Sequence, residues 1–275
     1  MRNITLLGLA CMAGFASAQS LTTLTTTGGT FAVNSGSFTS LATALGGSCN
    51  FTPTGSSDYA FRNMWAYRQA GETREYMTSG SGATFASTVD TFTMTVDRNF
   101  GNTGTNNLRF VLNYRLVSLT PTSPMLIATM SVQNIGTTAA TLTLFNYNDY
   151  DVPGTSGDAI SSSYTDANGI FARQSDSTIT TNFVEHYAVG ASAYRHGTLY
   201  SSIFNNTAVD NLNNTVTAGT GDFGTGFQWA DRTLQVGEST SYTMYSSLNS
   251  AVPEPATMTA LGLGVAALLR RRKKA

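Results

Sequence analysis

Three aspartates in one short stretch have the spacing that comes nearest to a metal site. Asp149, Asp151 and Asp158 stand within residues 146–158, where carboxylate and amide oxygens crowd a strand-like run that leads into a Gly-rich loop. Hard oxygen ligands of this kind bind Ca²⁺, which extracellular modules hold with dissociation constants of about 10⁻⁴ to 10⁻³ M. The stretch lacks the Gly and Glu of an EF-hand loop, and Asp in a turn often caps its own backbone instead. Calcium is therefore a hypothesis here, and the sequence predicts no other cofactor.

Acid or base chemistry would have to use one of only two histidines, His186 and His196. His186 follows Glu185, but neighbouring positions on a strand point to opposite faces, so we expect no contact between these two side chains. The Ser run at residues 161–163 predicts a loop, because no base stands at a fixed spacing from it. HExxH, GxSxG, Walker and CxxC motifs are absent from the sequence. We predict a protein that is not an enzyme. A secreted hydrolase, which would need two acids or a His, an acid and a Ser brought together in a cleft, is the least favoured alternative.

Two pairs of aromatic residues have the spacing of a ligand platform. Trp65 and Tyr67 stand two apart, as do Phe227 and Trp229, so each pair shares one face of a strand. Flat rings can stack on sugars, but large aromatic side chains are usually found in the core, where each buries about 150–250 Å². We expect core packing; an exposed ring pair would instead favour carbohydrate binding.

The elements that must position these residues are predicted to be β-strands. Apolar and polar residues alternate in residues 91–96, 108–116 and 241–246, as they do in half-buried strands. Residues 126–132 and 141–144 flank an Asn-Ile-Gly turn, and residues 233–239 lead into 242–248; each arrangement predicts a hairpin. After Leu144 the apolar positions change parity, which indicates a bulge or a face crossing. The fold class predicted is all-β, an antiparallel β-sandwich.

One sandwich domain over residues 59–250 is the simplest organisation, and two fused sandwiches are the alternative. Residues 19–58 are rich in Thr, Gly and Ser and predict either edge strands or a lead-in. Cys49 is the only cysteine after residue 18, so no internal disulfide is expected in that part of the chain. We interpret Cys49 as a small, partly buried residue, because no neighbouring histidine would activate its thiol.

The charge of the chain is divided between its ends and its middle. Residues 19–252 hold nine Arg, no Lys and fifteen acidic residues, a net charge of −6. Such a balance argues against nucleic acid as a partner, because binding to phosphates depends on cations. The chain has 43 Thr, 28 Ser and 20 Asn, so its solubility comes from neutral hydroxyl and amide groups.

The N-terminal residues have the three parts of a secretory signal peptide. Arg2 precedes an apolar run over residues 4–15, and Ala16-Ser17-Ala18 supplies the small residues of a cleavage site. Residues 1–18 therefore predict export across the inner membrane by the secretion machinery. A signal peptidase is expected to cleave after Ala18.

Three segments follow one another in residues 252–274. Val252, Pro253, Glu254 and Pro255 form a tetrapeptide that the prolines keep extended. Residues 256–269 carry no charge, and a helix of that length spans roughly 21 Å, short of the ~30 Å hydrocarbon core. The cations at residues 270–274 are expected to stay cytoplasmic, which places the preceding chain across the membrane.

This tripartite end resembles the PEP-CTERM sorting signal of exported bacterial proteins, over about 23 of the 275 residues. The resemblance implies that a membrane transpeptidase of the exosortase type recognises Val252–Pro255, that the short C-terminal hydrophobic helix inserts only transiently, and that the protein reaches the cell surface or an extracellular matrix. A permanent tail anchor is the alternative. Exopolysaccharide is then a candidate partner. We predict an exported structural or adhesion protein, with a carbohydrate- or calcium-dependent binding module as the alternative.

Overall fold

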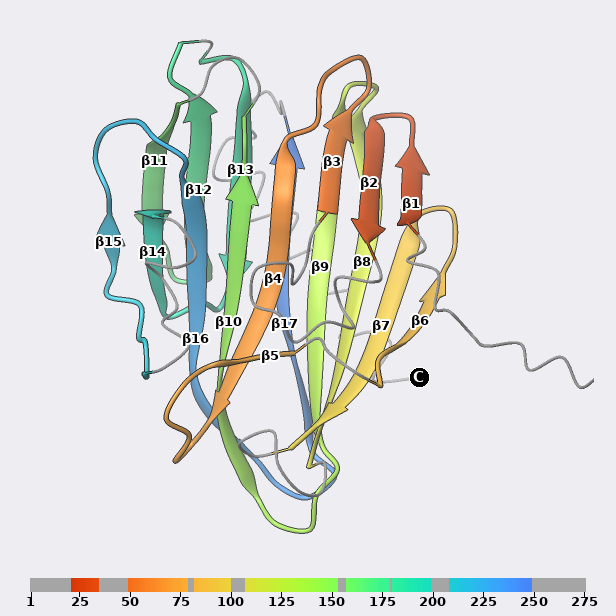
Figure 1. The fold of residues 1–275 in the computed structure, drawn as a ribbon, viewed down its shortest axis with the longest axis vertical. Helices are drawn as coiled ribbons and strands as arrows, with labels where there is room; N and C mark the ends of the chain where they lie inside the picture. Colours follow the sequence, from red (N-terminus) through yellow and green to blue (C-terminus); the bar gives the residue numbers. More distant parts are fainter. Residues whose placement is uncertain are drawn as a thin grey trace, which may run out of the picture.

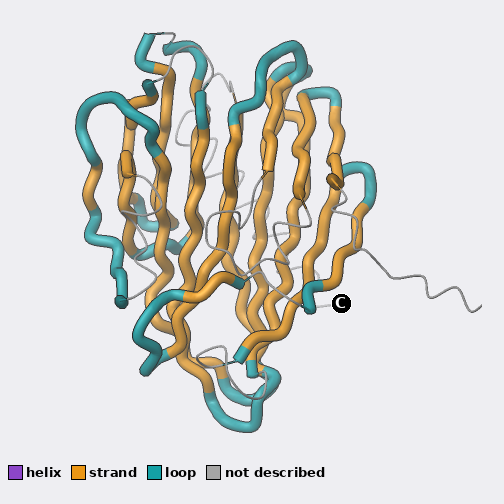
Figure 2. Tube along the Cα trace, viewed as in Figure 1, coloured by secondary structure: helices purple, strands orange, loops and turns teal. Residues whose placement is uncertain are grey.

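The computed structural model describes residues 21–34, 49–78, 82–99, 107–152, 157–178, 180–198 and 208–248. Throughout these ranges the regular elements are β-strands, arranged in two layers that face each other (Figures 1 and 2). The predicted all-β antiparallel sandwich is confirmed. The strands are β1 (Leu21–Thr26), β2 (Gly29–Asn34), β3 (Cys49–Pro53), β4 (Ala60–Gln69), β5 (Tyr76–Met77), β6 (Thr84–Ser87), β7 (Thr91–Arg98), β8 (Leu108–Thr120), β9 (Ser123–Asn134), β10 (Ala140–Tyr150), β11 (Asp158–Thr165), β12 (Gly169–Asp176), β13 (Phe183–Val189), β14 (Ala193–Thr198), β15 (Thr215–Val216), β16 (Gly224–Leu234) and β17 (Ser239–Leu248).

The strands form three sheets. An eight-stranded sheet has the order β11-β12-β13-β17-β9-β8-β7-β6, and a six-stranded sheet has the order β15-β14-β16-β10-β4-β5. A three-stranded sheet, β1-β2-β3, covers residues in the Thr-rich stretch before residue 58 and lies beside β4 in Figure 1. Neighbouring strands are antiparallel, apart from the short parallel pairing of β14 with β15.

Alternation of side chains produces the core between the layers. In β8, the side chains of Leu108, Phe110 and Leu112 are fully buried, whereas Arg109 and Arg115 on the other face are exposed. The predicted core position of the aromatic pairs is also confirmed. Trp65 of β4 stacks on Trp229 of β16 with 5.5 Å between ring centroids, and both side chains are at most 3% exposed.

Neither predicted hairpin forms. β9 belongs to the eight-stranded sheet and β10 to the six-stranded sheet, and β16 and β17 are divided in the same way. Alternation determines which face of a strand is apolar but not which sheet the strand joins. Here the apolar faces of the two consecutive strands meet across the layers, so the strands are not neighbours in one sheet. Asn134 links the β9–β10 connection to the β16–β17 connection, because its side-chain amide donates to Thr138 O at 2.8 Å and to Leu234 O at 2.9 Å. Its backbone also bonds to Gly237 and Glu238.

The parity change after Leu144 reflects burial on both faces of β10. Asn146 and Asn148 continue the inner face, and both are fully buried. Phe145 and Tyr147 face outward and pack with Leu212, from the segment that precedes β15, in a second apolar cluster. β10 therefore does not cross from one face to the other, although its pairing with β16 shifts register between Leu142 and Leu144.

Both histidines lie inside the sandwich. His186 of β13 and His196 of β14 have no exposed surface, and His186 Nδ1 lies 2.9 Å from Ser246 Oγ. The ring of His196 stacks on Tyr194 with 4.7 Å between centroids. Burial lowers the pKa of each histidine to about 3. At His186, the positive charge of His196 also contributes to the lowering of the pKa. Both imidazoles are therefore neutral at pH 7.

Replacement of Trp65 by Ala should lower the free energy of unfolding by about 3–5 kcal/mol, because it removes a buried ring and leaves a cavity. Urea unfolding followed by circular dichroism measures this loss. Val236→Ala is the control, since this side chain is 58% exposed and should cost less than about 0.5 kcal/mol. Similar losses from both variants would contradict the buried position of Trp65.

The buried histidines should make the protein less stable in acid. Each has a pKa of about 3 when folded and an ordinary value of 6.5, so between these values the unfolded chain binds more protons. Stability therefore rises with pH across this interval, by up to about 1.4 kcal/mol per pH unit for each histidine. His186→Gln or His196→Gln should reduce this slope, as measured by urea unfolding at several pH values.

Buried carboxyl groups with raised pKa values act in the opposite direction, because they hold a proton in the folded state that the unfolded chain has lost. The comparison is therefore between slopes of variant and wild type, not between absolute stabilities. Slopes that do not change in either histidine variant would show that these imidazoles titrate normally.

Candidate functional site

Three carboxylates converge at one end of the sandwich, and two of them belong to the predicted calcium set. Asp149 is the penultimate residue of β10, Asp151 follows that strand, and Asp222 stands two residues before Gly224, the first residue of β16. One carboxylate oxygen of each lies within 4.8 Å of the others. Strand pairing explains this arrangement, because Asp149 lies opposite Gly224 in the ladder between β10 and β16.

The surroundings of this carboxylate triplet favour a positive charge. Asp149 is only 8% exposed, whereas Asp151 and Asp222 are exposed. The pKa of Asp149 is raised to about 6, mainly by burial and also by the charges of Asp222 and Asp151, while the neighbouring Arg62 opposes the shift. Within the described residues, no hydrogen bond reaches the Asp149 carboxylate. Three hard oxygen donors at this separation match the ligand type that Ca²⁺ prefers.

Asp158 does not belong to the triplet. Its Oδ2 accepts hydrogen bonds from Val152 N at 3.3 Å and from Gln174 Nε2 at 3.0 Å. Burial raises the pKa of Asp158 to about 7. The predicted set of three is therefore corrected: Asp158 fixes the start of β11 in the interior, and its place beside Asp149 is taken by Asp222. Only the pairing of β10 with β16 identifies Asp222, which is distant in sequence.

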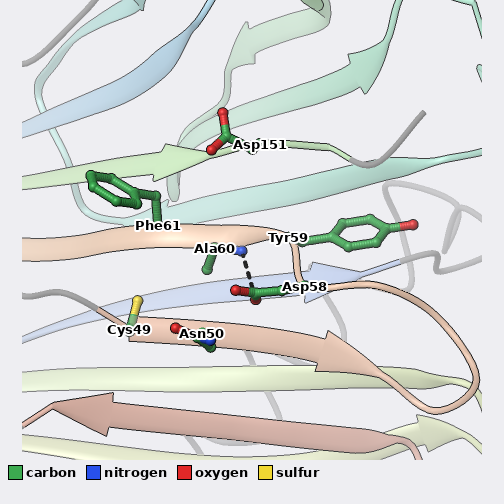
Figure 3. Close-up of a pocket in the computed structure, with 7 residues that line it drawn as sticks. All are labelled: Cys49, Asn50, Asp58, Tyr59, Ala60, Phe61 and Asp151. Atoms are coloured by element: carbon green, nitrogen blue, oxygen red, sulfur yellow. Dashed lines mark hydrogen bonds between the residues drawn. The ribbon is translucent and has the colours of Figure 1, made fainter. Parts of the chain in front are cut away.

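A pocket of about 160 Å³ opens beside Asp151, and Asp151 is one of its lining residues. Figure 3 shows the other lining residues on the start of β3, the start of β4 and the loop between them. Asp58 Oδ1 accepts hydrogen bonds from the backbone N–H groups of Phe51 at 2.7 Å and Ala60 at 3.2 Å, which holds this loop in place. The Phe61 ring is 49% exposed at the pocket. The lining residues are Cys49, Asn50, Asp58, Tyr59, Ala60, Phe61 and Asp151.

The pocket combines polar groups with one exposed ring, which suits a ligand that carries hydroxyl groups. Burial raises the pKa of Asp151, and the charges of Asp222 and Asp58 raise it further. Burial also raises the pKa of the Cys49 thiol, so this cysteine stays protonated and is a weak nucleophile. No sequence pattern points to Asp58 or Phe61, since each stands alone in a turn or a strand.

Neither histidine is among the residues that line this pocket. The carboxylate of Glu185 forms an ion pair with Arg173, whereas the ring of His186 points into the core, so the prediction that these neighbours do not touch is confirmed. His186 does contact Ser246, but both side chains are fully buried. A base and a hydroxyl group are thus adjacent in a place where the described residues leave no exposed surface for a substrate.

The predicted processing sites Ala18 and Val252–Pro255 lie outside the described residues. Among the residues that are described, none forms a helix long and apolar enough to cross a membrane.

Comparisons with solved structures show the fold. A galactose mutarotase related enzyme from Lactobacillus acidophilus superposes with a TM-score of 0.53 at 8% identity, over 86% of this chain and 99% of that one. A bacterial glucoamylase in complex with acarbose superposes with the same TM-score and identity, over 89% of this chain but only 34% of the glucoamylase. At this identity the likeness extends to the fold alone.

The comparison with known families concerns the C-terminal residues. No curated protein is significantly similar to the sequence. Residues 251–273 match the family described as PEP-CTERM protein-sorting motif. The chain therefore carries, after its β-sandwich, the C-terminal sorting signal of exported bacterial proteins.

Proposed function

We propose that this protein is a cell-surface or extracellular-matrix component whose sandwich serves as a structural or adhesion module. The sorting motif at residues 251–273 carries the proposal, because it indicates export and processing by an exosortase at the membrane. The composition supports it, since residues 19–252 rely on Thr, Ser and Asn rather than on charge for solubility. A hydroxyl-rich surface of this kind suits contact with exopolysaccharide, which offers hydroxyl groups of its own.

Burial of the two histidines supports a role without catalysis. A general base must come within about 3 Å of the proton that it removes, and both imidazoles are enclosed by the two layers. Their lowered pKa values follow from the same burial. These observations favour a binding or building role for the sandwich over a hydrolase that uses a Ser-His-acid triad.

A calcium-dependent binding module is the second candidate. The carboxylate triplet of Asp149, Asp151 and Asp222 supports it, because a divalent cation would relieve the repulsion among three acids and the burial of Asp149. The adjacent pocket, with Asp58, Asn50 and the exposed Phe61 ring, would then offer room for a saccharide. Asp151 belongs to both the triplet and the pocket, so one side chain would couple cation and ligand.

Removal of the sorting motif should stop processing. In the source cells, Glu254→Gln or Pro253→Ala should leave most of the protein in the membrane fraction with Ala275 still attached, because the motif no longer fits the transpeptidase. Intact-mass spectrometry of the mature termini measures this, and it also tests whether the chain begins at Gln19.

Met258→Leu is the matched control, since it keeps the apolar character of the segment after the motif and should be processed normally. Wild-type protein recovered with both Met1 and Ala275 in place would refute export and processing together.

Calcium should stabilise the wild-type protein. At ten times the dissociation constant, binding adds about 1.4 kcal/mol and raises the melting temperature by about 3–5 °C. Asp149→Asn and Asp222→Asn should each remove the response, because each takes away one of three ligands. Calorimetric titration and thermal unfolding with and without Ca²⁺ provide the two measurements.

Asp90→Asn serves as the control, because Asp90 lies in the turn before β7 and outside the triplet. It should retain the full calcium response. Neither heat nor a shift in melting temperature for the wild type would eliminate the calcium candidate, while leaving export and processing untouched.

A further inference from the structure

The chain leaves the sandwich at a fixed point. β17 ends at Leu248, four residues before Val252 of the sorting motif. β17 lies between β13 and β9 in the eight-stranded sheet, and Ser247 pairs with Glu185 on one side and Met125 on the other. A strand that is bonded on both sides resists the fraying that frees an edge strand. The sorting segment therefore starts from a well-anchored position.

This exit point lies at the same end of the sandwich as the carboxylate triplet. Tyr150, the last residue of β10, packs against His186 across the layers with 4.9 Å between ring centroids, and His186 pairs with Ser246 of β17. The β3–β4 loop is at this end too, because Ala60 pairs with Tyr150. In Figure 1 this end is at the top, and the turns that join β9 to β10 and β16 to β17 lie at the bottom.

The connection to the membrane is shorter than the sandwich is long. Eight Cα–Cα steps separate Leu248 from Ala256, the first residue of the uncharged segment, and at full extension they reach about 29 Å. β8 alone has 13 residues and spans about 40 Å. An inverted orientation, with the β16–β17 turn toward the lipid, would need a longer connection than the chain provides.

We propose that, while the sorting segment holds the chain at the membrane, the end of the sandwich that carries Asp149, Asp151 and Asp222 faces the lipid surface, and that removal of the segment frees this end for large ligands. The inference rests on the proposed processing. Chain length rather than attraction sets the orientation, because this end is acidic and residues 19–252 contain no Lys. The carboxylate triplet and the adjacent pocket are consequently screened until the protein is released.

Energy transfer from a single dye to acceptors on lipid headgroups tests the orientation. The chain from Gln19 to Ala275, with Cys49→Ala, carries the dye either at Ser57→Cys in the β3–β4 loop or at Val236→Cys in the β16–β17 turn; both residues are exposed. It is reconstituted in vesicles of phosphatidylethanolamine and phosphatidylglycerol. Transfer should be several-fold stronger from position 57 than from position 236. Equal melting temperatures of the two labelled chains establish that both are folded.

Equal transfer from the two dyes, or stronger transfer from position 236, overturns the proposal, and so does failure of the chain to float with the vesicles. In cells, labelling of Ser57→Cys by a bulky polyethylene glycol maleimide should increase when the sorting segment is removed, while labelling of Val236→Cys should not change. Equal labelling of Ser57→Cys before and after removal contradicts the screening. Normal processing combined with equal energy transfer would defeat this inference alone, whereas unprocessed wild-type protein would defeat the proposed function.

Discussion

The burial of β10 on both faces is the constraint on which the rest of the structure depends. Its inner face carries Leu144, Asn146 and Tyr150 into the space between the layers, and its outer face places Phe145 and Tyr147 under the segment that contains Leu212. A strand enclosed in this way has one register, because a slip by one residue would exchange two different sets of buried side chains. That register fixes where β10 ends, and the end of β10 positions Asp149 and Asp151.

The interior near the end of β10 is polar, and its amide groups are linked in a hydrogen-bond network. Asn63 donates to Asn148 Oδ1 at 2.7 Å, Asn148 donates to Asn146 Oδ1 at 2.7 Å, and Tyr114 donates to Asn63 Oδ1 at 2.8 Å. Linked amides of this kind stabilise little compared with apolar packing, but each becomes costly if its partner is lost. The network therefore specifies how the two layers align, while the apolar core between β4, β8 and β9 supplies most of the driving force.

The sequence predicts the strands correctly but not how they pair. Alternation in residues 108–116 and 241–246 is a local property, and β8 and β17 form where it occurs. The turn after residue 134 is equally local, yet whether it joins neighbours in one sheet or crosses between layers depends on distant contacts, such as that of Asn134 with Leu234. The place of Asp222 in the triplet is not predictable from the sequence for the same reason, since only the β10–β16 pairing brings it to Asp149. Asp158 has the right spacing in sequence, but β11 begins there and pairs with β12, which turns its carboxylate toward Gln174.

The last strand, β17, completes the eight-stranded sheet directly before the sorting motif. β17 supplies the shared neighbour of β13 and β9, so without residues 239–248 the eight-stranded sheet divides into β11–β13 and β6–β9. Neither part can bury its backbone donors and acceptors along that gap, and unpaired groups of this kind are costly away from water. The sheet is therefore complete only when the last strand has emerged, and the sorting motif follows within four residues. Because Cys49 is the only cysteine in the described residues and is not in a disulfide, no covalent link can hold an incomplete sandwich together. The last strand that the eight-stranded sheet needs and the sorting motif therefore lie in one continuous stretch at the C-terminal end of the chain.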